Sequence, residues 1–132
     1  MNLVIGNTSQ LSRYFPDNFI KISSRNISDS IFEQRWNRVF LCFAEQRTFI
    51  SKDNLFNQVN VEYTKNIIEK IKADKIIYYS TAELWNKTTG EIDANSDISY
   101  HYSDYVASKE TITNYIKHYY SNVIVLYPFN FN

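Results

Sequence analysis

The segment YVASK, residues 105–109, places Tyr105 one helical turn before Lys109. Residues four positions apart lie on the same face of an α-helix. Tyrosine, with a reference pKa of about 10, exchanges protons poorly at neutral pH, but an ammonium about 4 Å away lowers that pKa by roughly three units at an effective dielectric constant of about 20. Tyr105 and Lys109 are therefore candidates for a proton-transfer pair, or a tyrosine and a lysine that merely share a helix face.

Thr81 is a further candidate, because it follows the apolar segment KIIYYS (75–80), which is typical of a buried strand. Ligands of open α/β sheets bind outside the carboxyl ends of the strands, where a threonine hydroxyl can hydrogen-bond a reacting oxygen. The alternative is a hydroxyl that only caps the end of the strand.

A turn at the start of the chain has phosphate-binding character. The apolar segment 2–5 is followed by GNTSQLS, in which Gly6, Ser9 and Ser12 have the spacing of a glycine-rich dinucleotide turn. With glycine at only one of the three positions, a plain strand–turn–helix fits about as well. The segment FIKIS (19–23) leads to Arg25 with no acidic residue, so Arg25 is expected to meet a 2′-phosphate, which favours NADP over NAD, or to be a surface charge.

Apolar segments predict the elements that must position these residues. Four segments are continuously apolar and typical of buried parallel strands, namely 2–5, 38–43, 75–80 and 122–127. The segment 19–23 is a weaker fifth candidate. Helical spacing predicts helices over 53–73, with Asp53 as the N-cap, and over 102–120. The alternation predicts an α/β fold with a doubly wound, mainly parallel sheet in three layers, with 2–5 beside 38–43.

Composition narrows the classes of partner. The 132 residues, 44% hydrophobic and 21% charged, are expected to form one domain. Fourteen basic residues balance fourteen acidic ones, which argues against nucleic-acid and membrane partners. The longest apolar run, VFLCFA, is far shorter than the roughly 20 residues of a membrane span, and the N-terminus lacks the features of a signal peptide. The single cysteine, Cys42, is expected to be a buried, reduced thiol in a cytoplasmic protein.

Metal chemistry is not predicted. His101 and His118 are expected at the surface, and no His, Cys or carboxylate pair has convincing metal-ligand spacing.

Five segments, in order, resemble the extended short-chain dehydrogenases/reductases, the group of nucleotide-sugar epimerases and dehydratases. VFLCFAEQRT is similar to their fourth strand and loop, and NQVNVEYTKNIIE to their N-V-x-G-T helix. KIIYYSTAELW is similar to the strand ending in S-[ST]-x-E-V-Y, YVASK to Y-x-x-x-K, and VIVLYPFN to R-P-x-N. The resemblance covers nearly the whole chain.

The resemblance implies a Rossmann-type domain that binds NAD(P) and transfers hydride, with Tyr105, Lys109 and Thr81 as the catalytic group. The positions implied to bind the cofactor are Gly6, Ser9, Gln10, Leu11, Arg25, Ala44, Asn60 and Pro128. The positions implied to bind the nucleotide-sugar are Glu83 and Asn130.

Departures from the family qualify this expectation. Ala82 replaces the aspartate acid of sugar 4,6-dehydratases, Tyr63 the glycine of N-V-x-G-T, and Tyr127 the arginine of R-P. The first helix has room for two turns at most, and the stretch between Arg25 and Arg38 has almost none for a full helix–strand pair. Family members continue into a smaller substrate domain, so residues 1–132 are expected to be an NAD(P)-binding domain that lacks it, with little activity alone.

Two alternatives remain open. The chain is either a catalytic domain of this kind, or a non-catalytic protein that kept the fold to bind a nucleotide or to dimerise. A homodimer is expected through the helices 53–73 and 102–120, because the family pairs there. These helices also carry more aromatic side chains than one helix face can bury within the chain, namely Tyr63, Tyr115, Tyr119 and Tyr120.

Overall fold

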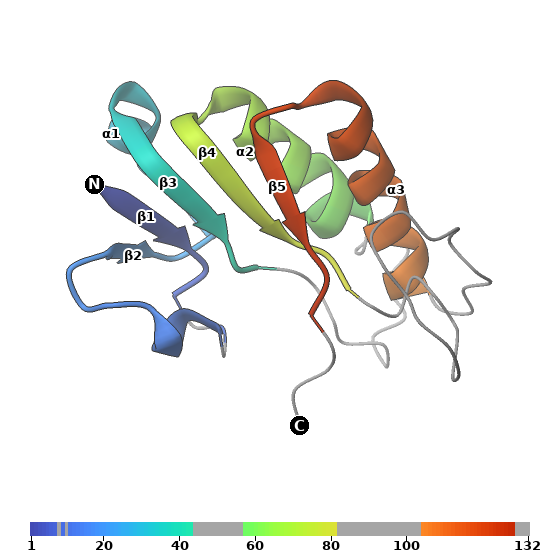
Figure 1. Cartoon of the computed structure of the whole chain (residues 1–132), viewed down its shortest axis with the longest axis horizontal. Coiled ribbons are helices and arrows are strands. Elements are labelled where there is room, and N and C mark those ends of the chain that lie inside the picture. Colours follow the sequence, from blue (N-terminus) through green and yellow to red (C-terminus); the bar gives the residue numbers. More distant parts are fainter. Residues whose placement is uncertain (8, 10, 44–56, 82–103, 129–132) are drawn as a thin grey trace.

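The chain forms a parallel sheet with helices packed against it in a computed structural model (Figure 1). The structure describes residues 1–7, 9, 11–43, 57–81 and 104–128, with side chains at all of them except 57, 58, 104 and 105. The elements, in chain order, are β1 (Asn2–Ile5), η1 (Leu11–Tyr14), β2 (Ile20–Ile22), α1 (Asp29–Glu33), β3 (Arg35–Leu41), η2 (Asn57–Tyr63), α2 (Thr64–Lys70), β4 (Lys72–Tyr79), α3 (Asp104–Tyr119) and β5 (Val123–Leu126).

The five strands lie in the order β2-β1-β3-β4-β5, and every neighbouring pair is parallel. The predicted α/β fold with a parallel sheet is confirmed, and β1 lies beside β3 as expected. Because β2 and β3 flank β1 on opposite sides, the strand order reverses there, which is the switch point of a doubly wound sheet.

Strands β3 and β4 begin three residues earlier than predicted. The three added residues at the start of each strand include charged ones, which a search for apolar runs leaves out. Arg35 pairs with Lys72 in the ladder, and the Arg35 guanidinium lies 2.6 Å from the Asp74 carboxylate. Both partners are more than half exposed, so this ion pair contributes little to stability.

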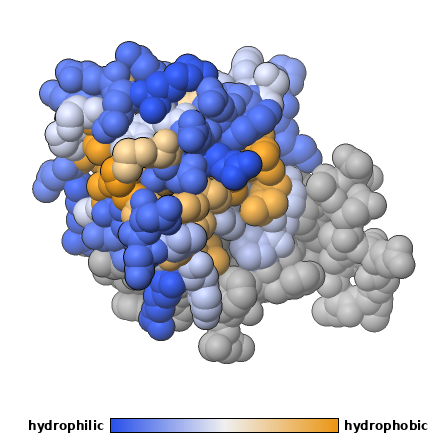
Figure 2. All heavy atoms as spheres, turned by 60° about the vertical axis from the view of Figure 1, so that its left-hand side comes forward, coloured by the Kyte–Doolittle hydropathy of each residue, from blue (hydrophilic) through white to orange (hydrophobic). Residues whose placement is uncertain are grey.

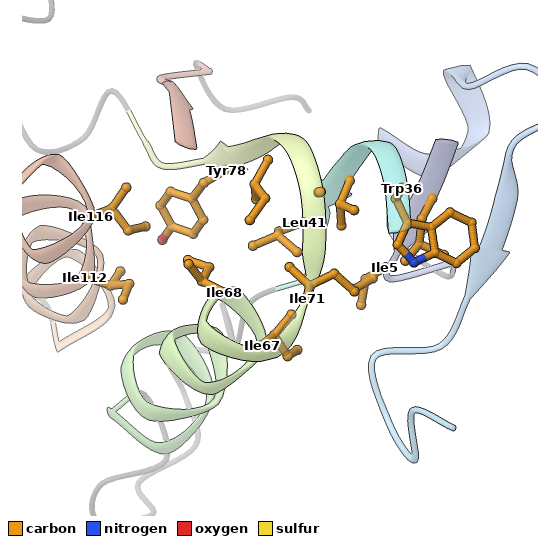
Figure 3. Packing of buried hydrophobic residues seen from close by; sticks show 13 residues of the cluster. Ile5, Trp36, Leu41, Ile67, Ile68, Ile71, Tyr78, Ile112 and Ile116 are labelled. Atoms are coloured by element: carbon orange, nitrogen blue, oxygen red, sulfur yellow. The ribbon is translucent and has the colours of Figure 1, made fainter. Parts of the chain in front are cut away.

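Helices α2 and α3 cover one face of the sheet (Figure 1). Residues on alternate positions of the strands, such as Val39 and Ile76, meet Ile68 of α2 and Ile112 of α3 in the main core. Figure 3 shows the labelled side chains of both helices pointing to the sheet. Ile112 is fully buried, and burying one such side chain stabilises the fold by about 1.5–3 kcal/mol.

A thinner layer covers the other face. The Phe15 ring centre lies 4.6 Å and the Phe19 ring centre 5.8 Å from that of Phe40, whose strand neighbours point to the helices. The predicted first helix is a single 3-10 turn, η1. At β5, one of the two edge strands of the described sheet, Ile124 and Leu126 are 45% and 43% exposed.

Helix α1 is short, as the limited space before Arg38 predicted. It lies beside the end of α2, where the Lys70 ammonium is 5.9 Å from the centre of the Phe32 ring. Figure 2 turns the left-hand side of Figure 1 forward and shows a mostly hydrophilic surface with apolar residues in small groups. No helix among the described residues combines the length and apolar character needed to span a bilayer.

The first of the two long helices begins with a π-helical segment, η2, before α2. The Thr64 hydroxyl donates to the Val59 carbonyl five residues earlier, which matches the wider π turn. The predicted N-cap, Asp53, lies outside the described residues.

Gly6 joins the ends of three strands. Its φ of +111° lies in the region that favours glycine, and a Cβ built on it would meet the Cys42 carbonyl oxygen at 2.7 Å. The backbone amides of Gly6 and Asn7 both donate to the Ile22 carbonyl. The turn after β1 is therefore held tightly against both β2 and β3.

Gly6→Ala should lower the free energy of unfolding by at least about 2 kcal/mol, because alanine meets both an unfavourable φ and the Cys42 carbonyl. Urea denaturation measures the change. As a control, Asn114→Ala on the exposed side of α3 should change stability by no more than about 0.5 kcal/mol. Equal stability of the two variants would contradict the argument.

Candidate functional site at the carboxyl edge of the sheet

The carboxyl ends of the strands are nearly level. Ile5 lies opposite both Ile22 and Leu41, and Leu41 lies opposite Tyr78. Because all strands are parallel, the residues that follow them gather at one edge of the sheet. The described residues at this edge are 6, 7, 9, 11, 12, 23–26, 42, 43, 80, 81, 127 and 128.

Lys109 of α3 reaches this edge at the end of β4. Its side chain is 3% exposed, and its Nζ donates to the Tyr79 carbonyl oxygen at 2.7 Å. Nζ also lies 4.5 Å from the centre of the Tyr78 ring. Burial lowers the pKa of Lys109 to about 7. The amine therefore exchanges a proton near neutral pH.

Thr81 is 3% exposed and lies two residues after Tyr79. The structure thus brings Lys109 and Thr81 to the same strand end, as the sequence predicted. Tyr105 lies in the first turn of α3, one turn before Lys109, but its side chain lies outside the described residues.

Buried polar contacts fix α3 beside Lys109. Ser80 Oγ and Thr113 Oγ1 are 2.7 Å apart, and Asn60 Nδ2 donates to Ser108 Oγ at 3.0 Å. These contacts join α3 to the end of β4 and to η2. Sequence reasoning missed Ser108 and Thr113, although Thr113 lies one turn after Lys109 on the same helix face and a polar residue there was a usable signal.

Asn60, predicted near the cofactor, is 1% exposed and bonded to Ser108. This bond joins η2 to α3, the helix that carries Lys109. Among the other predicted positions, Pro128 is half-buried two residues after β5. Gln10, Ala44, Glu83 and Asn130 lie outside the described residues, as does His101. His118 is exposed, and no group of three His, Cys, Asp or Glu able to hold a metal ion occurs within the described ranges.

The turn after β1 uses its own polar groups. Ser12 Oγ is 2.9 Å from the Asn7 carbonyl and 2.8 Å from the Ser9 carbonyl, and the Ser12 amide lies 3.2 Å from Ser9 Oγ. The Ser9 hydroxyl accepts in this contact, so its hydrogen is left to donate. Since the Gly6 and Asn7 amides bond to Ile22, a phosphate here would meet the Ser9 hydroxyl rather than these two amides. Leu11 begins η1 and is half-buried.

The loop after β2 carries Arg25, which is exposed, and its amide bonds to Ser23 Oγ at 3.1 Å. The adjacent Ser24 carbonyl accepts a hydrogen bond from the Tyr63 hydroxyl of η2. The Tyr63 ring lies edge-on to Phe43, with centroids 5.5 Å apart. Tyr63 was expected at a dimer surface on the helices. In the structure its side chain has partners within the chain, at the carboxyl edge of the sheet, and the dimer stays a prediction.

The other three tyrosines of the dimer expectation lie on or just after α3, namely Tyr115, Tyr119 and Tyr120. The Tyr120 hydroxyl donates to Glu69 Oε1 at 2.9 Å, and the Lys65 ammonium lies 4.5 Å from the Tyr115 ring centre. The Tyr119 ring lies tilted against the Tyr115 ring, with centroids 4.7 Å apart, and Tyr119 is 63% exposed.

Cys42 is buried at the end of β3, and burial raises the pKa of its thiol to about 12. The thiol is therefore protonated and unreactive at neutral pH. The predicted buried, reduced cysteine is found in the structure.

Solved structures share this fold. A UDP-glucuronic acid 4-epimerase from Bacillus cereus, solved with NAD, matches with a TM-score of 0.75 at 15% identity over 98% of this chain and 56% of its own. An ADP-L-glycero-D-manno-heptose-6-epimerase from Helicobacter pylori matches with a TM-score of 0.72 at 13% identity over 94% and 52%. A dTDP-4-dehydrorhamnose reductase from Clostridium acetobutylicum matches with a TM-score of 0.68 at 18% identity over 95% and 52%.

At these identities the likeness is one of fold. The chain spans about half the length of these solved structures. No protein-family model matches the sequence, and no curated protein matches it significantly.

The buried Lys109 should make stability depend on pH. Its pKa is about 7 when folded and 10.5 when unfolded, so between these values the unfolded chain binds a proton that the folded chain does not. The free energy of unfolding therefore rises with pH, by about 2 kcal/mol from pH 7 to 8.5. Below pH 7 both states bind the proton, so Lys109 gives no pH dependence there. Lys109→Met should remove the rise in urea denaturation measured over this range.

The range ends at pH 8.5 because of Cys42, whose pKa is 9.0 in the unfolded chain. Above that range the unfolded chain loses the thiol proton before the folded one, which lowers stability as pH rises. Lys72→Met removes an exposed lysine of β4 and should keep the wild-type pH dependence. A pH dependence that is the same in Lys109→Met and wild type would refute the burial argument.

Proposed function

We propose that this chain is an NAD(P)-binding domain of the kind found in nucleotide-sugar epimerases, reductases and dehydratases. One observation carries the proposal: the Lys109 amine is buried at the carboxyl end of β4, beside Thr81 and one helical turn after Tyr105. The structural neighbours support it, since the epimerase from Bacillus cereus was solved with NAD and also with UDP-glucuronic acid.

The residues present fit a dinucleotide in part. The close turn at Gly6 and the donor hydrogen of Ser9 suit the pyrophosphate, and the exposed Arg25 suits a 2′-phosphate, which favours NADP. Further positions proposed for the cofactor are Gln10, Leu11, Ala44, Asn60 and Pro128. A bound nicotinamide would accept or return a hydride there.

In this proposal Tyr105 exchanges a proton with the sugar oxygen and Thr81 holds that oxygen by a hydrogen bond. Lys109 assists by electrostatics. With a pKa of about 7, its amine is partly charged at neutral pH, and a tyrosinate nearby favours the charged form further. Each charge thus stabilises the other, so loss of the tyrosine proton is coupled to the charging of Lys109.

We also propose that residues 1–132 act as the dinucleotide half of such a protein, with Glu83 and Asn130 as its contribution to a nucleotide-sugar site. Turnover by these residues alone is expected to be low. The attraction between charges 4 Å apart is about 1 kcal/mol in water and about 4 kcal/mol at a partly buried site, so the help that the buried Lys109 gives to Tyr105 depends on how far the cleft around Tyr105 is closed to water.

Calorimetric titration tests the proposal, with binding of both NADP and NAD expected and NADP the tighter. Arg25→Ala should remove the advantage of NADP, because it removes the charge that meets the 2′-phosphate. Arg35→Ala is the matched control, since it removes an arginine from the opposite edge of the sheet. In assays with nucleotide-sugars, turnover should stay below about 1 per second and disappear in Tyr105→Phe.

Absence of dinucleotide binding would refute the proposal and leave a dimerising protein that kept the fold. Turnover in the usual enzyme range of roughly 1–1000 per second, lost in Tyr105→Phe, would show instead that these residues form a complete enzyme.

A homodimer through η2–α2 and α3 is a second proposal. It rests on the exposed Tyr119 beside Tyr115, because exposed aromatic groups of this kind mark interfaces.

Sedimentation equilibrium should give twice the chain mass of 15.7 kDa. Tyr119→Asp should shift the chain to monomer, because a charge there would be buried on pairing. Tyr14→Asp, at an exposed tyrosine of η1 away from both helices, should leave the dimer intact. A monomer at high concentration in the wild type would count against the dimer.

A further inference from the structure

Tyr63 spans the carboxyl edge of the sheet at the switch point. Its ring packs against Phe43, which follows β3, while its hydroxyl donates to the carbonyl of Ser24, which follows β2. The strand between β2 and β3 is β1. The Tyr63 side chain contacts the residues that follow β2 and β3, the two neighbours of β1. It therefore passes across the end of β1, next to the turn at Gly6.

The same region receives the adenosine half of a dinucleotide in open α/β sheets. The pyrophosphate lies at the turn after the first strand, and the ribose of the adenosine lies at the end of the second. In this chain those places are the turn after β1 and the loop Ser23–Asn26. Tyr63 bonds to that loop and shields it from the side of η2.

We propose that Tyr63 occupies the adenosine side of the dinucleotide site and acts as a gate that an adenosine-bearing ligand must displace from Ser24. The inference rests on the proposed dinucleotide function and adds to it a residue that sets ligand preference. The nicotinamide side is unaffected, because Lys109 and Thr81 lie at the end of β4, on the far side of β3 from Ser24.

The contacts of Tyr63 hold its side chain against the loop after β2, and they are few enough for a ligand to displace it. Among the described residues they are one hydrogen bond to a backbone carbonyl and one edge-on ring contact with Phe43. Burial raises the pKa of Tyr63, so the hydroxyl keeps its donor proton at neutral pH. Glycine stands at this position in the resembling family, and the tyrosine here fills space that glycine would leave open.

Three variants separate the parts of this gate. Tyr63→Ala removes ring and hydroxyl, whereas Tyr63→Phe keeps the ring and removes the bond to Ser24. Tyr120→Ala is the matched control, since it removes another half-buried tyrosine, whose hydroxyl bonds to Glu69 away from the carboxyl edge. Each is titrated calorimetrically with ADP-ribose, nicotinamide mononucleotide and NAD, after thermal unfolding has shown that it is folded.

Tyr63→Ala should bind ADP-ribose at least about tenfold more tightly than wild type, a gain of about 1.4 kcal/mol. Its affinity for nicotinamide mononucleotide should stay within about twofold, and Tyr63→Phe should gain about threefold for ADP-ribose because its ring is no longer tethered. Tyr120→Ala should match wild type. If Tyr63→Ala does not fold, the gain in Tyr63→Phe decides.

Equal or weaker binding of ADP-ribose by the Tyr63 variants, with nicotinamide mononucleotide or NAD still bound, would overturn the gate and leave the proposed function standing. Failure of wild type and all variants to bind any of the three ligands would overturn both.

Discussion

The parallel register of the sheet is the constraint on which the other features depend. Because the strands β1, β2, β3 and β4 end level with one another, every segment that follows a strand is delivered to the same edge. The close approach of Gly6 to the Cys42 carbonyl then fixes how tightly the first of these segments turns. The candidate site needs no architecture of its own, since the sheet places it.

Within this frame, Lys109 is a position where folding and chemistry have opposite requirements. Ile112 and Ile116 of α3 are fully buried against the sheet, and this contact carries the nearby lysine into the same dry layer. An ammonium there is unfavourable unless it is bonded or discharged. The Tyr79 carbonyl and a pKa of about 7 provide both solutions. An apolar residue would serve the fold better, so the lysine indicates a role at the edge of the sheet.

The sequence predicted the sheet well because continuous apolar runs mark strands that are covered by helices. It placed the starts of β3 and β4 three residues late, since Arg35 and Asp74 are charged and their pairing depends on the neighbouring strand. The nearness of Lys109 and Thr81 was predictable from a strand end and a helical spacing.

The supporting contacts could not be predicted in the same way. The bond from Asn60 to Ser108 depends on how two helices are rotated against each other, which spacing within one helix does not define. The contact of Tyr63 with Ser24 was not predictable either, because it joins residues 39 positions apart, through the π turn of η2 and the loop after β2.

Every pair of neighbouring strands in the described sheet is parallel, so the chain crosses over between strands and no pair can form as a local hairpin. The loop entropy of each crossover must be lost before strand pairing compensates for it, which makes folding of such a sheet slow. The last strand, β5, bears the exposed Ile124 and Leu126. During refolding this apolar strand is available to other chains until β4 is in place, so the speed of folding, as well as the stability of the final fold, governs how much protein escapes aggregation.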